Sequence, residues 1–249
     1  MEKFALITWS SRGIGRAIAL QLAKDGYNII IHYKSHKQKA DEVLCEVEAL
    51  WRKWFIVQSD IVDYKNLENI FEELQNFTDH IDVLVNNVGF DYDKSLEEYP
   101  IEEIQSVIDI VLTSKLIITK LALPYLKRSK GWHVINIASR LWKSSVIPWV
   151  LPYASAEAWV IRFTEFCVAE MSKKYSIRFN TVAPWLTDTD YSRLYIKNQA
   201  DWDSIASKNP SGRVWNPEDI ANVISYLCSE KWSYINGECI QVTGWSQFS

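Results

Sequence analysis

Short apolar runs alternate with helical segments along the whole chain. Strand-like runs lie at residues 4–8, 28–33, 55–58, 83–86, 133–138, 178–182 and 239–242. Apolar positions at helical spacing fill the gaps at 14–24, 38–50, 66–76, 101–126, 153–174 and 217–227. This alternation is typical of βαβ units, whose parallel sheet is covered on both faces. It predicts an α/β fold in which residues 1–249 form a single doubly wound Rossmann-type domain with a seven-stranded, mainly parallel sheet.

The longest stretch without a predicted element is 186–216. It is polar and contains Asp188, Asp190, Pro210, Ser211 and Gly212. A long loop at the carboxyl edge of a parallel sheet is typical of a segment that covers the substrate. A surface excursion with no role is the alternative.

Residues 3–24 comprise the first strand, a turn and the first helix. The turn is rich in small residues, among them Ser10, Ser11, Gly13 and Gly15. Free amides at a helix N-terminus favour a phosphate, and a doubly wound sheet holds a dinucleotide at such a turn. An ordinary βα loop is the alternative, because GxG alone is weak evidence. Trp9 is unexpected here, since a side chain directly after the strand would collide with the ligand or the helix.

Composition narrows the class of protein. With 249 residues, 48% hydrophobic and 23% charged, the chain suits one large domain. Its net charge of −4 argues against a nucleic-acid partner. The four cysteines, Cys45, Cys167, Cys228 and Cys239, lack metal spacing, so we expect reduced thiols and no metal site. No apolar run reaches membrane-spanning length and no signal peptide opens the chain, so we expect a cytoplasmic protein that does not bind membranes.

The end of the second strand bears on the choice of cofactor. It reads HYKSHK at residues 32–37, without the carboxylate that an NAD site places there. Lys34 and Arg12 would attract a 2′-phosphate, which favours NADP(H) over NAD(H), although both could be solvated surface charges. Asp60 after the third strand suits the adenine amino group, or it caps the turn before Asp63.

Three further motifs follow later strands. They are Asn86-Asn87-Val88-Gly89, Ser139, and YASAE starting at Tyr153. With TWSSRGIG at 8–15 they resemble the short-chain dehydrogenase/reductase family, closest to its 3-oxoacyl-[acyl-carrier-protein] reductases. The resemblance extends through RFNTVAP at 178–184, residues 212–221 and residues 234–244. Each motif is weak alone, but their joint order along the chain is specific.

The resemblance implies an NADP(H)-dependent oxidoreductase that reduces a carbonyl, such as a 3-oxoacyl thioester of fatty acid biosynthesis. The substrate would be a small molecule or would be bound to an acyl carrier, and the enzyme would be a homo-oligomer, dimer or tetramer. The implied cofactor-binding residues are Thr8, Ser10, Ser11, Arg12, Gly13, Ile14, Gly15, Tyr33, Lys34, Ser35, Asp60, Ile61, Asn87, Val88, Gly89 and Pro184. The implied catalytic positions are Ser139, Tyr153 and Glu157.

Two departures from the family concern catalysis. Tyr153 would be the acid and Ser139 the orienting hydroxyl, but the family lysine that lowers the tyrosine pKa is here Glu157, and the relay asparagine aligns with Val111. At an effective dielectric of 20, unit charges about 4 Å apart interact by roughly 4 kcal/mol, so an ionised Glu157 would raise the pKa of Tyr153. We therefore expect a poor reductase, and expect Glu157→Lys to restore activity once the cofactor can enter. A non-catalytic member that binds a nucleotide or a partner is the alternative.

Tryptophan is unusually frequent, with 12 residues against 8 glycines. Trp9, Trp159, Trp185, Trp215 and Trp245 stand where the resembling family has glycine, and Trp51, Trp54, Trp132, Trp142, Trp149, Trp202 and Trp232 lie at turns or strand starts. None occupies an obvious core position. We hypothesise that these are glycine codons, UGA in the lineage of origin, translated as tryptophan. Divergence of a decaying paralogue is the alternative, and several UGG codons among the twelve would refute the recoding.

Two surface features bear on partners. The helices at 101–126 and 153–174 carry surplus apolar residues that would pack between subunits in the resembling family: Ile108, Leu112, Leu116, Ile117, Phe163, Phe166 and Val168. Basic residues end the same helices: Lys127, Arg128, Lys130, Lys173 and Lys174. They either attract an acidic carrier or simply complement the helix C-termini.

Overall fold

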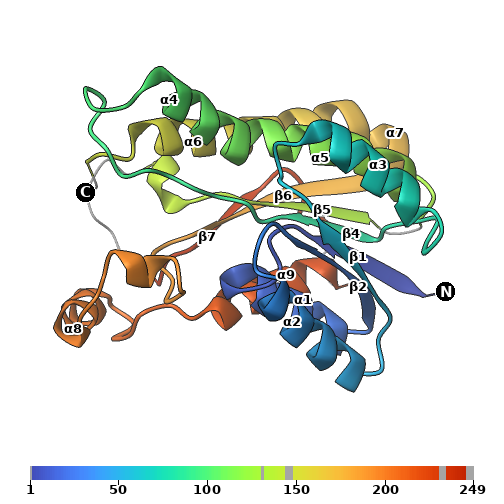
Figure 1. The fold of residues 1–249 in the computed structure, drawn as a ribbon, viewed down its shortest axis with the longest axis horizontal. Helices are drawn as coiled ribbons and strands as arrows, with labels where there is room; N and C mark the ends of the chain where they lie inside the picture. Colours follow the sequence, from blue (N-terminus) through green and yellow to red (C-terminus); the bar gives the residue numbers. More distant parts are fainter. Residues whose placement is uncertain (1, 130–131, 144–147, 230–233, 245–249) are drawn as a thin grey trace.

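The computed structural model describes residues 2–129, 132–143, 148–229 and 234–244. Its strands are β1 (Lys3–Ile7), β2 (Tyr27–Tyr33), β3 (Trp54–Gln58), β4 (Val83–Asn86), β5 (Trp132–Ile137), β6 (Ile177–Pro184) and β7 (Cys239–Val242). They form one sheet in the order β3-β2-β1-β4-β5-β6-β7, and every pairing is parallel (Figure 1). The expected seven-stranded doubly wound sheet is confirmed.

Helices cover both faces of the sheet. They are α1 (Gly13–Lys24), α2 (Lys37–Ala49), α3 (Tyr64–Leu74), α4 (Ile101–Ile108), α5 (Ser114–Leu126), α6 (Leu151–Cys167), α7 (Lys173–Tyr175), α8 (Gln199–Lys208) and α9 (Pro217–Cys228). Helices α1, α2 and α9 lie on one face, and α3 to α6 lie on the other (Figure 1). Each face has its own buried apolar cluster, because the β strands send alternate side chains to opposite sides.

The two long predicted helices are each interrupted. A π-helical turn, η1 (Asp109–Thr113), separates α4 from α5, and a second, η3 (Val168–Ser172), separates α6 from α7. Such turns leave backbone carbonyls without their usual helical partners and occur often at functional sites.

The sequence predicts no secondary structure in the segment 186–216, and this prediction is wrong. The segment contains α8 and a short 3₁₀ turn, η4 (Ser192–Leu194). Asn198 caps α8, since its Oδ1 accepts a hydrogen bond of 2.9 Å from the Asp201 amide. Because α8 buries none of its side chains, it has no apolar face that periodicity could reveal.

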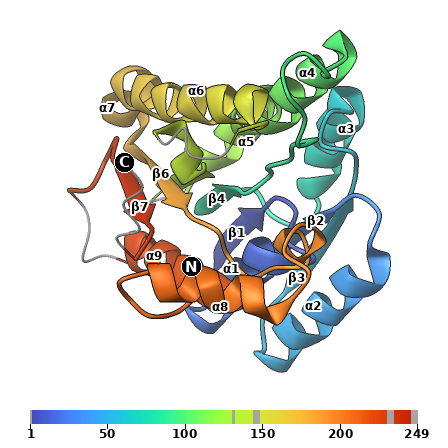
Figure 2. The ribbon, with the colours of Figure 1, turned by 90° about the vertical axis from the view of Figure 1, so that its left-hand side faces the viewer.

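The chain changes direction across the sheet at β1, which pairs with β2 on one side and β4 on the other. The carboxyl ends of β1 and β4 therefore carry the turn at 8–13 and the segment 87–89 to the same edge. In doubly wound sheets, ligands bind in the crevice at this switch point. Figure 2 views the sheet from this edge, with α8 and the loop after β6 in front.

A ladder of buried polar side chains crosses the sheet just before this edge. Asn86 donates through Nδ2 to Asn136 Oδ1 (2.8 Å) and to Thr119 Oγ1 (3.1 Å). Asn136 donates to Thr164 Oγ1 on α6 (2.9 Å), and Thr181 donates to the same oxygen (2.8 Å). The polar ladder thus links β4, β5 and β6 to α5 and α6.

Three of the tryptophans have backbone conformations that favour glycine: φ is 50° at Trp9, 58° at Trp51 and 69° at Trp149. This is what turn positions chosen for glycine would show, and the codons remain the test of recoding. The expectation that no tryptophan lies in the core is wrong for Trp215, which is only 4% exposed. Trp232 and Trp245 lie outside the described residues.

The structure shows where the apolar surface residues and the cysteines lie. Leu116 and Phe166 are 38% and 63% exposed, so part of the α5 and α6 face is apolar and open. All four cysteines are free thiols. Within the described residues, no helix is long and apolar enough to cross a membrane, and no cluster of three or more His, Cys, Asp or Glu side chains is arranged for a metal.

Candidate active site

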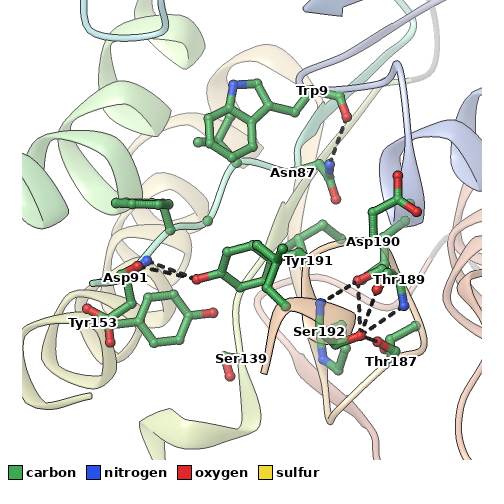
Figure 3. A pocket seen from close by; sticks show the side chains of 18 of the residues that line it. Trp9, Asn87, Asp91, Ser139, Tyr153, Thr187, Thr189, Asp190, Tyr191 and Ser192 are labelled. Carbon is green, nitrogen blue, oxygen red and sulfur yellow. Dashed lines mark hydrogen bonds between the residues drawn. The ribbon is translucent and has the colours of Figure 1, made fainter. Parts of the chain in front are cut away.

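A cleft of about 1070 Å³ opens at the carboxyl edge of the sheet (Figure 3). Sixteen of the residues expected from the sequence line it: Ser11, Arg12, Gly13, Ile14, Tyr33, Lys34, Ser35, Asp60, Ile61, Asn87, Val88, Gly89, Ser139, Tyr153, Glu157 and Pro184. They come from the ends of β1 to β6 and from α6. The cleft therefore brings the cofactor-binding and catalytic candidates together.

Thr8, Ser10 and Gly15 do not line the cleft but hold its floor. Thr8 Oγ1 accepts from the Asn87 amide (2.8 Å), and Ser10 Oγ accepts from the His32 amide (3.1 Å). A Cβ on Gly15 would lie 2.7 Å from Asn87 Nδ2, so only glycine fits there. These three residues fix the turn after β1 against β2 and β4.

The start of α1 suits an anion. Arg12 is the N-cap residue, but its side chain makes no capping bond, and Gly13 has a φ of 54°. The first amides of α1 therefore lack a side-chain acceptor among the described residues, and they face the cleft. This arrangement fits the pyrophosphate of a dinucleotide.

Trp9 is the exception to that fit. Its indole lines the cleft and packs against the apolar cluster that includes Ile61 and Val88. Its Nε1 is buried and has no acceptor among the described residues. The indole takes space beside the phosphate turn, while the remaining cleft stays open next to it.

Acidic residues accompany the cations at the mouth of the cleft. Lys34 Nζ lies 2.5 Å from the Asp60 carboxylate, and Lys39 on α2 pairs with Asp190 of the loop after β6. Lys39, and more weakly Arg12, lower the pKa of Asp190. Asp60 pairs with Lys34 and also caps the turn before Asp63, since its Oδ1 accepts from the Val62 amide (3.4 Å). Asp63 in turn caps α3, and its Oδ1 accepts from the Asn66 amide (3.1 Å). A phosphate at Lys34 would compete with Asp60 for the same ammonium group.

Ser139 and Tyr153 face each other across the base of the cleft (Figure 3). Ser139 ends the β5 segment and accepts a hydrogen bond from the Leu141 amide (3.2 Å). Burial and the charge of Glu157 raise the pKa of Tyr153 well above 10, although hydrogen bonding to Ser139 opposes this. Burial raises the pKa of Glu157 to about 7, and the nearby charge of Lys115 opposes this.

Lys115 was missed by the sequence analysis. It is 1% exposed, and its Nζ donates to the carbonyls of Val88 (2.6 Å) and Val111 (2.7 Å). Burial lowers its pKa, and the charge of Glu157 opposes that effect. A signal was present, because Val107, Val111 and Lys115 follow one another at four-residue intervals, which places a lysine on the buried face of its helix.

The rest of the cleft lining includes an aromatic and apolar wall, most of which was not anticipated. It comprises Phe90, Tyr92, Leu141, Val150, Trp185, Leu186, Tyr191, Leu194, Tyr195, Ile196, Ile205 and Trp215. Tyr191 ties this loop across the cleft, since its hydroxyl accepts from the Asp91 amide (3.3 Å) and donates to the Asp91 carbonyl (3.4 Å). The segment 186–216 therefore lines the cleft, as its position in the sequence predicts.

The basic residues ending α5 and α7 lie at the other edge of the sheet. Lys127 and Lys174 meet over the Tyr175 ring, at 4.0 and 5.0 Å from its centroid. Helix α7 leads directly into β6, which spans eight residues, or about 26 Å, before reaching the cleft. A carrier docked on this patch would be separated from the cleft by the length of the sheet. Lys130 lies outside the described residues.

Comparison with known proteins gives a consistent result. Residues 9–244 match the family described as enoyl-(acyl carrier protein) reductase. The chain is 32% identical over 244 residues to the 3-oxoacyl-[acyl-carrier-protein] reductase FabG of Staphylococcus aureus strain Mu50, covering 98% of both chains. It is 32% identical to the FabG of Aquifex aeolicus, covering 97% of this chain and 96% of that protein.

Solved structures agree in fold. A short-chain dehydrogenase from Burkholderia cenocepacia in complex with NADP superposes with a TM-score of 0.88 at 27% identity, covering 97% and 96% of the two chains. YwfH, an NADPH-dependent reductase involved in bacilysin biosynthesis, superposes over the whole of both chains with a TM-score of 0.93 at 24% identity. The second likeness concerns the fold alone.

Proposed function

Because the chain belongs to the short-chain dehydrogenase/reductase family, a family of oxidoreductases, we propose that it is an NADP(H)-dependent reductase of an apolar carbonyl compound such as a 3-oxoacyl thioester. The observation that carries the proposal is the meeting of Ser139 and Tyr153 in one cleft with the phosphate turn of α1. Relatives named as 3-oxoacyl-[acyl-carrier-protein] reductases support the substrate class.

The chain's own residues would act on the carbonyl oxygen. A bound dihydronicotinamide supplies the hydride. Tyr153 donates its proton to the oxygen as negative charge develops there, and Ser139 donates a second hydrogen bond that orients the carbonyl. The raised pKa of Tyr153 keeps the hydroxyl protonated at neutral pH, which suits a proton donor better than a proton acceptor.

Nucleotide binding would use the floor and mouth of the cleft. The amides at Gly13 and Ile14 would hold the pyrophosphate, and Asn87 to Gly89 would flank the nicotinamide ribose. Arg12 and Lys34 would bind a 2′-phosphate, which is our basis for NADP(H) over NAD(H). Occupation of Lys34 by phosphate would release Asp60 toward the adenine.

The aromatic wall favours an apolar acyl group over a sugar or a highly charged substrate. The basic patch at Lys127 and Lys174 does not support delivery by a carrier, because it lies at the opposite edge of the sheet. We propose that the substrate enters past the loop after β6, whether free or attached to a carrier. Homo-oligomerisation through α5 and α6, a cytoplasmic location and a single domain over 1–249 complete the proposal.

A non-catalytic role is the second candidate. The observation that favours it is Glu157, whose charge raises the pKa of Tyr153 where the family lysine would lower it. A protein that binds NADPH but turns over no carbonyl would have this property.

An NADPH-oxidation assay with a 3-oxoacyl thioester separates the two candidates. The protein is prepared as written and with glycine at the twelve tryptophan positions, and NADPH binding is measured separately by titration calorimetry. We expect thioester-dependent oxidation that Tyr153→Phe abolishes while NADPH binding remains. Binding without oxidation in both preparations would establish the non-catalytic role instead.

A further inference from the structure

Lys115 is a buried cation that hydrogen-bonds to carbonyl oxygens and, among the described residues, to no carboxylate. Its Nζ donates to two backbone carbonyls, Val88 (2.6 Å) and Val111 (2.7 Å), and its side chain is almost completely enclosed. Carbonyl dipoles satisfy the N–H groups but do not neutralise the charge. A buried ammonium group is costly unless an opposite charge accompanies it.

The π-helical turn η1 makes this arrangement possible. In a regular helix, the Val111 carbonyl would accept from the backbone amide four residues on. In η1 the side chains of the next turn take over, since Lys115 Nζ binds the Val111 carbonyl and Ser114 Oγ binds the Ile110 carbonyl (2.6 Å). The ammonium group is therefore anchored between η1 and the Val88 carbonyl that follows β4.

Glu157 supplies the opposite charge from α6. It is 1% exposed, and its Oε1 lies 3.7 Å from the position of a Cβ on Gly89, the residue next to the Val88 carbonyl that Lys115 holds. The Tyr153 hydroxyl lies at the same 3.7 Å from that position. Lys115, Glu157 and Tyr153 thus converge on the 88–89 segment from two helices.

Glu157 also has unused hydrogen-bonding capacity. Its Oε2 is buried and has no partner among the described residues. Glu157 lines the cleft, and a carboxyl oxygen without a partner can carry a proton. The residue is four positions after Tyr153, so both side chains lie on one face of α6.

We propose that Glu157 in its acid form returns the proton to Tyr153 after each reduction, and that Lys115 is the positioning residue whose charge stabilises the resulting carboxylate. The cation of the catalytic centre has in effect moved from α6 to α5. This inference rests on the proposed reductase function.

The Tyr153 O–H bond breaks as its proton passes to the substrate oxygen. The O–H bond of the Glu157 carboxyl then breaks, and its proton passes to the tyrosine oxygen. Glu157 is left as a carboxylate beside the Lys115 ammonium group, and it regains a proton from water when the product leaves the cleft. No group other than substrate and cofactor is oxidised or reduced.

The pH dependence follows from the groups that face Glu157. These are Lys115 from α5 and Tyr153 from α6, with Tyr191 of the loop after β6 facing Tyr153. The pKa of Glu157 is about 7, so reduction should decline as pH rises through neutrality. Lys115 lowers that pKa, so Lys115→Met should move the decline to higher pH by about one unit or more.

The experiment combines a double-mutant cycle with a pH profile. The variants are Lys115→Met, Glu157→Gln and the two together, with Lys120→Met as a control at an exposed position of the same helix. Thermal unfolding and infrared titration of the Glu157 carboxyl are measured without cofactor, and kcat for NADPH oxidation is measured from pH 5 to 9.

We expect each single variant to lower the unfolding temperature and the double variant to recover much of the loss, since removing one partner leaves a buried group unpaired. Lys115→Met should raise the pH at which the Glu157 carboxyl titrates and, by the same amount, the pH at which kcat declines. Lys120→Met should change neither pH. Glu157→Gln should lower kcat about 10²-fold or more and abolish its decline at alkaline pH.

The pairing of Lys115 with Glu157 would be refuted if the two substitutions lowered the unfolding temperature additively and the Glu157 carboxyl titrated at the same pH in Lys115→Met. If Lys115→Met turned over substrate and its kcat declined at the same pH as in the parent protein, the return of the proton from Glu157 to Tyr153 would be refuted. The reductase function would stand. Failure of every preparation to oxidise NADPH would refute the reductase function and the proton return with it, and the cofactor-free measurements would still decide the pairing.

Discussion

Replacing Trp51 by glycine should stabilise the protein. Trp51 follows α2 in a Schellman arrangement, in which its amide donates to the Glu48 carbonyl (2.8 Å) and the Arg52 amide donates to the Val47 carbonyl (3.3 Å). Its φ of 58° lies in the left-handed region, and its side chain is 92% exposed. The substitution therefore relieves backbone strain while removing almost no buried surface.

The expected size follows from two opposing effects. A left-handed conformation costs a non-glycine residue about 1–2 kcal/mol. Glycine returns about 0.4–1 kcal/mol of this through the larger entropy of the unfolded chain. The net gain should be about 0.5–1 kcal/mol, or roughly 1–4 °C in Tm for a domain of this size.

Urea and thermal unfolding of Trp51→Gly and Trp51→Ala measure this gain. Alanine keeps the Cβ that disfavours the left-handed region, so Trp51→Ala should stay close to the parent protein. Trp159→Gly provides a contrast, because Trp159 is exposed within α6 and glycine there should destabilise the helix by a few tenths to 1 kcal/mol. Equal stability of Trp51→Gly and Trp51→Ala would show that the backbone at this position is not strained.

Three further outcomes are expected. Trp9→Gly should tighten NADPH binding at least tenfold in calorimetry, because it removes an indole from the phosphate side of the cleft; tight NADPH binding by the parent protein would contradict the steric argument. Lys34→Ala should weaken NADPH binding about tenfold and leave NADH binding nearly unchanged, and equal losses for both nucleotides would show that Lys34 does not read the 2′-phosphate. Burial lowers the pKa of His32 to about 4 and that of His133 to about 3, below the unfolded value near 6.5, so the folded state binds fewer protons between these limits. These two histidines should therefore cost the free energy of unfolding a few kcal/mol as pH drops from 6.5 toward 4. The raised pKa of Glu157 acts with the opposite sign in this range, so the test uses Glu157→Gln as the parent, and a flat urea-unfolding profile of that variant from pH 7 to 4.5 would refute the prediction.

The sheet could be predicted from the sequence because its strands are short, apolar and rich in Val and Ile. All seven observed strands begin and end within two residues of the expected positions. Parallel strands buried on both faces read as continuous apolar runs, which polar turns then delimit. Helix α8 escaped prediction for the opposite reason, since it packs no apolar face against the domain.

The sequence predicted which residues form the candidate site but not the charge interactions among them. Motif positions identified Ser139, Tyr153 and Glu157, because these depend on local order along the chain. Lys115, the second residue of α5, comes close to Glu157 only because the preceding η1 packs against α6, which no local pattern reports. Its presence changes the expectation for Glu157→Lys, which would place two ammonium groups in one buried region. Glu157→Lys combined with Lys115→Val is the variant that would leave a single buried cation, at the position of the family lysine.

The polar ladder fixes how far β4, β5, β6 and α6 are shifted relative to one another along the strand direction, and so fixes the positions of the active-site residues that follow them. Asn86 and Asn136 are direct partners in the register of β4 and β5, and Thr181 faces Asn136 from β6. Apolar surfaces can slide by a fraction of an ångström at little cost, whereas a hydrogen bond tolerates little change in length or angle. Through Thr164, the ladder extends this constraint to the helix that carries Tyr153. The separation of Ser139 from Tyr153 should consequently be insensitive to repacking of the surrounding core and to thermal expansion, and changes at Asn136 or Thr164 should disturb it from three residues or three helical turns away.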